Sequence, residues 1–306
     1  MNIVRAEDYH VPVMLQECLE GMQLRPEGCY VDVTFGGGGH SRAILKELQG
    51  AGMLYSFDQD PDAAARAPQQ PCFTFIASNF RHLARFMDYY DRLGQVDAIL
   101  ADLGVSSHHF DAMERGFSFR DETPLLDMRM NNRAGLSARD LLNSYEEEQL
   151  ADVLYRYGEL KQSRCLAKLI VKARSVTPLQ TVGDLIAALR PALRPDQEKK
   201  LLACIFQALR IEVNGELKAL EELLEASLRV LRPGGRLVVM TYHSLEDRIV
   251  KNFLKGTDDS AEAQIYGTAR SAWRLVTRKP LVASAEELER NPRSRSAKLR
   301  IAERIR

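Results

Sequence analysis

The residues with the clearest chemical potential are four consecutive glycines, Gly36 to Gly39, which follow an apolar segment at residues 29–35. A helix-like segment comes next, at residues 42–48. A strand that turns through glycines into a helix lets a nucleotide-like ligand lie against bare backbone, because no Cβ atom stands in its way. The sequence therefore predicts a cofactor site at this turn.

An acidic residue follows at the distance that such a site requires. Asp58 ends the next apolar segment, residues 53–57, about twenty residues after Gly38. A carboxylate at that place can accept hydrogen bonds from two ribose hydroxyls. NAD and S-adenosylmethionine are both held in this way, so the turn and the acid leave the choice between them open.

Residues further along the chain favour S-adenosylmethionine. Two more apolar segments, at 72–77 and 96–101, end at Asn79-Phe80 and at Asp102. An aromatic ring can stack on adenine. An exocyclic amine is a poor nucleophile because its lone pair is delocalised, and a carboxylate such as Asp102 can localise that pair and remove the proton. The alternatives are a core aromatic at Phe80 and a turn residue at Asp102.

A Pro-Gly-Gly turn at 233–235 precedes the next apolar segment, which is typical of methyltransferase sheets. A dense polar cluster follows that segment, at residues 243–248. One interpretation is structural, with Ser244 as a helix cap and acids in the first turn. The other places His243 at the edge of a cleft, in contact with a nucleotide. His40 is similarly a pocket residue or a donor at a helix start. Neither His nor Cys shows metal-ligand spacing, so no metal is expected.

The order of these segments predicts the fold. The first hundred residues alternate between strand and helix patterns, which predicts a parallel sheet with helices on both faces. Only helical spacing occurs at 110–211, and the α/β pattern then resumes with a fifth strand at 236–243. We therefore predict one sheet domain from residues 1–109 and 212–306, interrupted by a helical insertion at 110–211 that forms one wall of a substrate cleft.

Charge is balanced over the whole chain but not along it. The 306 residues contain 42 Lys and Arg against 42 Asp and Glu, whereas residues 270–306 contain eleven Lys or Arg and four Glu. This tail is either solvated surface or a contact for RNA phosphates. Four arginines near Phe117 and Phe119 could add to such a contact, because arginine and aromatic side chains suit an unstacked base. They are Arg115, Arg120, Arg129 and Arg133.

Cysteine usage and hydropathy bear on the cell compartment. The five cysteines are odd in number and never spaced as CxxC, which is typical of reduced thiols in the core of a cytosolic protein. No segment approaches the ~20 apolar residues of a membrane span, and the first residues are too polar for a signal peptide. We expect a cytoplasmic protein that has no membrane partner.

Seven motifs, in the same order, resemble those of one family, the bacterial ribosomal RNA small subunit methyltransferases H, which are 16S rRNA cytosine-N4 methyltransferases. The motifs are HVPVML at 10–15, TFGGGGHS at 34–41, DLGVSS at 102–107, ERGFSF at 114–119, LDMRM at 126–130, YHSLEDRIVK at 242–251 and NPRSRS at 291–296. The likeness runs from about residue 10 to the end.

The resemblance implies a fold, a reaction and a site. The fold would be the mostly parallel, Rossmann-like sheet of class I methyltransferases with an inserted all-helical domain. The reaction would be methyl transfer from S-adenosylmethionine to N4 of one cytidine in the decoding region of 16S rRNA, within the small ribosomal subunit. The cofactor residues carried over by motif are Gly38, Gly39, His40, Asp58, Phe80, Asp102 and His109.

This chain departs from its relatives at two places. Many relatives have Pro-Gln where this chain has His108-His109, and the segment at 121–125 also differs. The family also lacks the acid-Pro-Pro-aromatic signature of amino methyltransferases, so the catalytic roles of Asp102 and His243 rest on position. A non-catalytic ribosome-assembly factor and a nicotinamide dehydrogenase are the alternatives. The oligomeric state stays open, with a homodimer among the alternatives.

Overall fold

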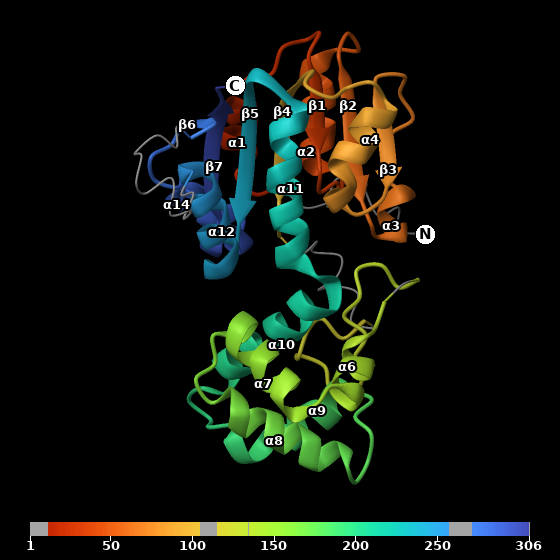
Figure 1. The fold of residues 1–306 in the computed structure, drawn as a ribbon, viewed down its shortest axis with the longest axis vertical. Coiled ribbons are helices and arrows are strands. Elements are labelled where there is room, and N and C mark those ends of the chain that lie inside the picture. The colour runs from red at the N-terminus through yellow and green to blue at the C-terminus, as the bar shows by residue number, and fades with distance from the viewer. Residues whose placement is uncertain (1–11, 105–114, 134, 257–270, 306) are drawn as a thin grey trace, which may run out of the picture. The chain divides into compact units, whose positions relative to one another are not determined.

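The computed structural model describes residues 12–104, 115–133, 135–256 and 271–305 (Figure 1). The chain divides into two compact units. The sheet unit consists of Met1–Gly104 and Leu217–Arg306, and the helical unit consists of Val105–Glu216. Among the helices that the structure describes, none is both long and apolar enough to span a membrane.

The sheet unit is built on seven strands in the order β3-β2-β1-β4-β5-β7-β6. The strands are β1 (Cys29–Asp32), β2 (Met53–Asp58), β3 (Phe73–Ala77), β4 (Val96–Asp102), β5 (Leu231–Thr241), β6 (Trp273–Leu275) and β7 (Lys298–Arg304). The first five pair in parallel, and β7 is antiparallel to both of its neighbours. The strand order reverses between β1 and β4, which is where open α/β sheets form a ligand crevice at the carboxyl ends of the strands. The mostly parallel, Rossmann-like sheet predicted from the sequence is confirmed.

Helices cover both faces of this sheet. They are α1 (Leu15–Met22), α2 (Gly39–Leu48), α3 (Pro61–Ala64), η1 (Phe80–His82), α4 (Leu83–Tyr89), α11 (Glu216–Val230), α12 (Ser244–Lys255), α14 (Ala285–Arg290) and η4 (Pro292–Ser296). Successive strand residues point to opposite faces, so Val31 and Ile99 join the apolar cluster under α4, α11 and α12. Tyr30 and Leu100 join the cluster under α1 and α2. Burial on both faces explains why the parallel strands are almost continuously apolar.

The C-terminal part of the sheet differs from the sequence prediction in two ways. The turn expected at 232–235 lies inside β5, as an irregularity between the pairs Val96–Leu231 and Ala98–Arg236, and Gly234 has φ +79° there. Part of the basic tail, expected to be either solvated surface or a contact for RNA phosphates, forms β6 and β7. Leu299 and Ile301 in β7 are buried, and this alternation of apolar and charged residues was hidden by the high charge of the segment.

Asp97 ties the beginnings of three strands together. Its carboxylate accepts hydrogen bonds from the Cys29 backbone N–H (2.8 Å), from Arg232 Nε (2.6 Å) and from Arg25 Nη2. Burial alone would raise the pKa of Asp97, but the bonds from Cys29 and Arg232 outweigh it, so the pKa lies below its usual range. The ionised form of Asp97 therefore stabilises the fold.

The sign of this effect predicts a pH-dependent stability. A carboxylate whose pKa is lower in the folded state contributes stability above its unfolded pKa of about 4, and that contribution is lost as the pH falls through the folded value. We expect Asp97→Asn to lower the free energy of unfolding at pH 7 by ~1–3 kcal/mol. Urea denaturation between pH 7 and pH 3 checks this, and a difference from wild type that does not shrink in acid would contradict it.

The helical unit has an apolar core of its own. Its helices are α6 (Ala138–Ser144), α7 (Glu147–Gly158), α8 (Ser163–Arg174), α9 (Val182–Leu189), η3 (Arg190–Ala192) and α10 (Glu198–Asn214). Leu154, Leu166 and Ile205 are fully buried within it. Capping boxes at Ser137 and Thr181 fix the starts of α6 and α9. A role for this unit in substrate recognition stays a prediction.

Candidate functional site

The glycine turn follows β1 and leads directly into α2. Gly38 is the N-cap of α2 and has φ +78°, a conformation that non-glycine residues rarely adopt. A Cβ atom at Gly38 would lie 2.7 Å from the ring of Phe35, and one at Gly39 would lie 2.4 Å from Cγ of Pro12. Both positions therefore require glycine, and the turn presents backbone N–H groups at the start of a ten-residue helix, a favourable place for an anionic or polar ligand group.

Asp58 lies beside this turn, at the end of β2. Its Oδ2 accepts a hydrogen bond from the Gly36 backbone N–H (2.7 Å), and its Oδ1 accepts one from the Asp60 N–H (2.8 Å). The structure thus brings together the two features that the sequence spacing linked. Asp58 also has a structural role, because its carboxylate holds the glycine turn in place through the bond from Gly36. The contact of Asp58 with a ribose stays a prediction.

A buried polar group below the turn was not predicted as part of the site. Asp32, which is 1% exposed, accepts hydrogen bonds from Ser41 Oγ (2.6 Å) and the Thr34 N–H (3.1 Å). Burial raises the pKa of Asp32, although His40 and the bond from Ser41 oppose the rise. These bonds fix the end of β1 to the first turn of α2. The signal in the sequence was an acid inside an otherwise apolar strand.

Asp102 ends β4 and is held from several directions. Its Oδ1 accepts a hydrogen bond from the Tyr242 hydroxyl (2.9 Å) and one from the Gly104 N–H (3.3 Å), while its own N–H donates to Thr34 Oγ1 (2.8 Å). Its side chain is 21% exposed. A carboxylate that is fixed by neighbours and still reaches solvent can accept a proton from a ligand without having to reorganise.

His40 and Tyr242 flank this carboxylate. The Nδ1 of His40 lies 3.8 Å from Asp102 Oδ2, and its Nε2 lies 3.2 Å from the carbonyl oxygen of Val13. Burial, and then the negative charge of Asp102, raise the pKa of Tyr242 far above its usual range. Tyr242 therefore keeps its proton and acts as a permanent hydrogen-bond donor to Asp102. His40 was among the site residues predicted from the sequence, whereas Tyr242 was not.

Phe80 begins η1, just after the end of β3. Its ring is partly buried and packs against the apolar cluster under α4 and α11. Its neighbour Asn79 is engaged within the protein, since Nδ2 donates to Gln59 Oε1 (2.9 Å) and Oδ1 accepts from the Arg81 N–H (2.9 Å). The position of Phe80 at a strand end agrees with an adenine pocket, whereas stacking on adenine stays a prediction.

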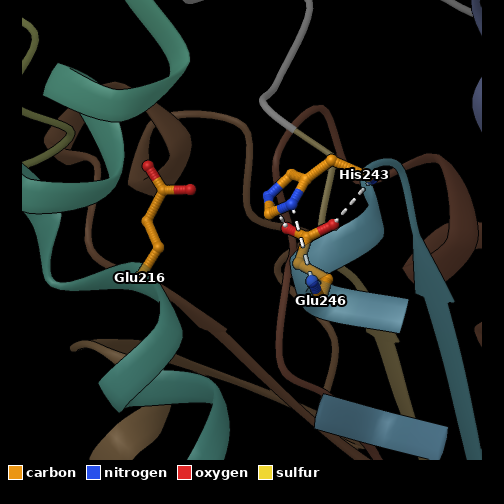
Figure 2. A group of neighbouring side chains, drawn as sticks. All are labelled: Glu216, His243 and Glu246. Atoms are coloured by element: carbon orange, nitrogen blue, oxygen red, sulfur yellow. Dashed lines mark hydrogen bonds and ion pairs between the residues drawn. The ribbon is translucent and has the colours of Figure 1, made fainter. Parts of the chain in front are cut away.

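His243 caps α12, and this corrects the expectation that Ser244 would do so (Figure 2). The buried carboxylate of Glu246 accepts hydrogen bonds from the backbone N–H groups of Tyr242 (2.9 Å) and His243 (3.3 Å). The Nε2 of His243 lies 3.1 Å from Glu246 Oε1. Glu216, also labelled in Figure 2, forms an ion pair with Arg210 inside the helical unit. A catalytic role for His243 stays a prediction beside this structural one.

The arginine and aromatic group in the helical unit is partly internal. Phe117 is buried, and Arg115 lies over its ring, 5.6 Å from the centroid, while donating a hydrogen bond to the Met130 carbonyl (2.7 Å). Arg129 pairs with Asp127. Of the predicted arginines, Arg120 and Arg133 are the exposed ones. His109, the weakest transfer from the family pattern, lies outside the residues that the structure describes.

Comparison with known proteins places this site in a family. The model of the MraW methylase family matches residues 7–305. "Ribosomal RNA small subunit methyltransferase H" of Porphyromonas gingivalis is 63% identical over 303 residues, which cover 97% of each chain. The protein of the same name from Parabacteroides distasonis is 61% identical and covers 97% of this chain and 98% of its own.

Solved structures match more distantly. TrmN from Thermus thermophilus is 13% identical with a TM-score of 0.42, and the match covers 95% of this chain and 48% of TrmN. The sequence relatives are far more similar, and their matches extend over almost the whole chain. The chain therefore belongs to the MraW methylase family.

Proposed function

We propose that this protein methylates N4 of a cytidine in the decoding region of 16S rRNA, within the small ribosomal subunit. As a member of a methylase family, the chain uses S-adenosylmethionine as its methyl donor. The names of its relatives support methylation of small-subunit rRNA. The choice of an amino group as the methyl acceptor rests on Asp102, a partly exposed carboxylate that its neighbours fix at the carboxyl end of β4.

The residues of the crevice fit the cofactor. The glycine turn leads from the end of β1 directly into α2, with Gly38 at φ +78°, which is the strand–turn–helix arrangement on which a nucleotide-like ligand lies against backbone. Their backbone, together with His40, would hold the amino acid part, Asp58 would accept bonds from the ribose, and Phe80 would contact the adenine. When bound, S-adenosylmethionine supplies a methyl group on a sulfonium that leaves readily.

The protein's own contribution is to orient the base and to take its proton. Asp102 would accept a hydrogen bond from the exocyclic amine, which concentrates the lone pair on nitrogen, and would then hold the proton that the amine loses. Orientation is the larger part of the barrier reduction, because the donor is already reactive and requires an in-line approach. The hydrogen bonds from Tyr242 and Gly104 keep the carboxylate in one place for both steps.

The decisive test uses small subunits from a strain that lacks the gene. Labelled S-adenosylmethionine should transfer its methyl group to these subunits, and mass spectrometry should map the product to N4 of one decoding-region cytidine. A folded protein that transfers no label would support the non-catalytic assembly factor instead. Calorimetry with S-adenosylhomocysteine and NAD separates the remaining alternative, since binding of NAD alone would indicate a dehydrogenase.

The Tyr242 hydroxyl should affect turnover more than binding. Tyr242→Phe keeps the ring that packs against Gly104 and removes only the donor to Asp102. A lost hydrogen bond to a charged group is worth about 1.5–3 kcal/mol, so we expect kcat to fall roughly tenfold to a hundredfold while the Kd for S-adenosylhomocysteine changes little. Single-turnover methylation and calorimetry measure the two effects, and a loss confined to Kd would argue against this role.

A further inference from the structure

A basic pocket lies at the far edge of the sheet unit, away from the glycine turn. It encloses about 250 Å³ between the last turns of α12, the segment that follows β6, and β7. These elements pack against one another at the β6 edge of the sheet (Figure 1). Five of the nine residues that line the pocket are Lys or Arg, and none is acidic. In a chain with equal numbers of acidic and basic residues, this is a local concentration of positive charge.

Four of these cations have no acidic partner in the part of the chain that the structure describes. They are Lys251 and Lys255 of α12 and Arg278 and Lys279 after β6. Three cations of the C-terminal segment have acidic partners, since Lys298 and Arg300 pair with Asp247 and Arg274 pairs with Glu303. Some cations of the basic tail therefore hold the sheet together, whereas Arg278 and Lys279 line the pocket beside the two lysines of α12.

The four cations repel one another, which destabilises this part of the protein. Lys251 and Lys255 are four residues apart on one helix, where like charges repel and destabilise the helix. Arg278 and Lys279 add two more positive charges around the same space. An anionic ligand would remove this repulsion and would gain charge-assisted hydrogen bonds from all four side chains.

We propose that this pocket binds consecutive backbone phosphates of the rRNA substrate, a conclusion that rests on the proposed function. A single phosphate would leave most of the four charges uncompensated, whereas a nucleic acid strand carries one negative charge per nucleotide. The volume is below that of most small-molecule sites, and the lining offers cations rather than an aromatic base platform. The pocket therefore contributes affinity and orientation, and sequence selection takes place elsewhere.

The experiment compares two full-length variants with the same change in net charge. The pocket variant replaces Lys251, Lys255, Arg278 and Lys279 by Gln. The control variant replaces four exposed cations on other helices of the sheet unit, namely Lys46, Arg85, Lys218 and Arg229, by Gln. Affinity for small subunits from the deletion strain is measured between 0.05 and 0.3 M salt, and circular dichroism confirms that both variants fold.

We expect the pocket variant to lose at least tenfold in subunit affinity near 0.1 M salt, and the magnitude of its log–log salt slope to fall by about 3, as four lost phosphate contacts require. The control should change the slope by less than 1. An unchanged slope in the pocket variant, or equal losses in both variants, would overturn the proposal. Binding of a polyglutamate peptide to both variants is measured as well. If the pocket variant loses the peptide but keeps its affinity for RNA, the proposal is overturned, because the pocket would then suit an acidic protein partner.

Methyl transfer separates this inference from the proposed function. In the pocket variant the KM for subunits should rise much more than kcat falls, and the Kd for S-adenosylhomocysteine should match wild type. If wild type methylates subunits and the pocket variant keeps the wild-type salt slope, the pocket inference fails alone. If wild type transfers no methyl group but the pocket variant still loses RNA affinity, the proposed reaction fails and the pocket inference stands.

Discussion

Replacing Asp102 by Asn is expected to lower kcat for methyl transfer roughly 10²–10⁴-fold, the usual contribution of a general base. Asn has nearly the same shape as Asp and its carbonyl oxygen can still accept the bond from the Tyr242 hydroxyl. It cannot hold the proton that the amine must lose, so the chemical step should suffer while the pocket keeps its form. Single-turnover kinetics on small subunits with saturating cofactor measures this directly.

Cofactor binding by the same variant shows whether Asp102 acts in the chemical step or in binding. The Kd of Asp102→Asn for S-adenosylhomocysteine should stay within about threefold of wild type, far less than the change in rate that a lost base would cause. Asp88→Asn, which removes an exposed carboxylate on α4 of the same unit, should match wild type in both measurements. If Asp102→Asn instead loses affinity and keeps its rate, Asp102 is a binding residue and the base is another group.

Asp58→Ala is expected to weaken the binding of S-adenosylmethionine by ~1–3 kcal/mol, the penalty for leaving buried polar groups without a partner. The structure adds a complication, since Asp58 also accepts the hydrogen bond from Gly36 that holds the glycine turn. The loss in affinity therefore combines a ribose contact with support of the turn. Calorimetry with S-adenosylhomocysteine measures the sum.

Asp58→Asn separates the two contributions. A single amide oxygen can still accept the bond from the Gly36 N–H, but the side chain no longer offers two charged oxygens to the ribose. The amide NH2 cannot accept the second bond, from the Asp60 N–H, so we expect Asp58→Asn to lower the melting temperature of the ligand-free protein less than Asp58→Ala does and still to bind the cofactor more weakly. Wild-type affinity in both variants would remove Asp58 from the pocket, and an equal drop in melting temperature in both would make its role structural.

Local signals in the sequence were enough for the parallel part of the sheet. The apolar segments ending at Asp58 and Asp102 became β2 and β4, because strands buried on both faces must be apolar along their length. The glycine turn was also readable, since a positive φ at Gly38 and the close approach of Phe35 leave no room for a side chain. Covalent and steric constraints of this kind act between residues that are near in the chain.

The C-terminal strands were missed for the opposite reason. In β7, Leu299 and Ile301 alternate with Lys298 and Arg300, and the charges made the segment resemble solvated surface. What makes it a strand is a partner, β5, whose hydrogen-bonding edge lies about sixty residues earlier in the chain. Burial of Arg300 is tolerated because Asp247 supplies a paired charge.

In the candidate site, too, some features follow from the local sequence and others depend on residues that are distant in the chain. The residue types and spacing of the glycine turn, Asp58 and Asp102 were enough by themselves to predict a nucleotide-like cofactor at the ends of parallel strands, since those features are set by local backbone geometry. Only the tertiary structure brought Tyr242 to Asp102, 140 residues apart in the chain, and gathered four cations from α12 and the segment after β6 into one pocket. Contacts of this kind depend on how strands and helices pack, and local sequence patterns carry no record of such distant neighbours.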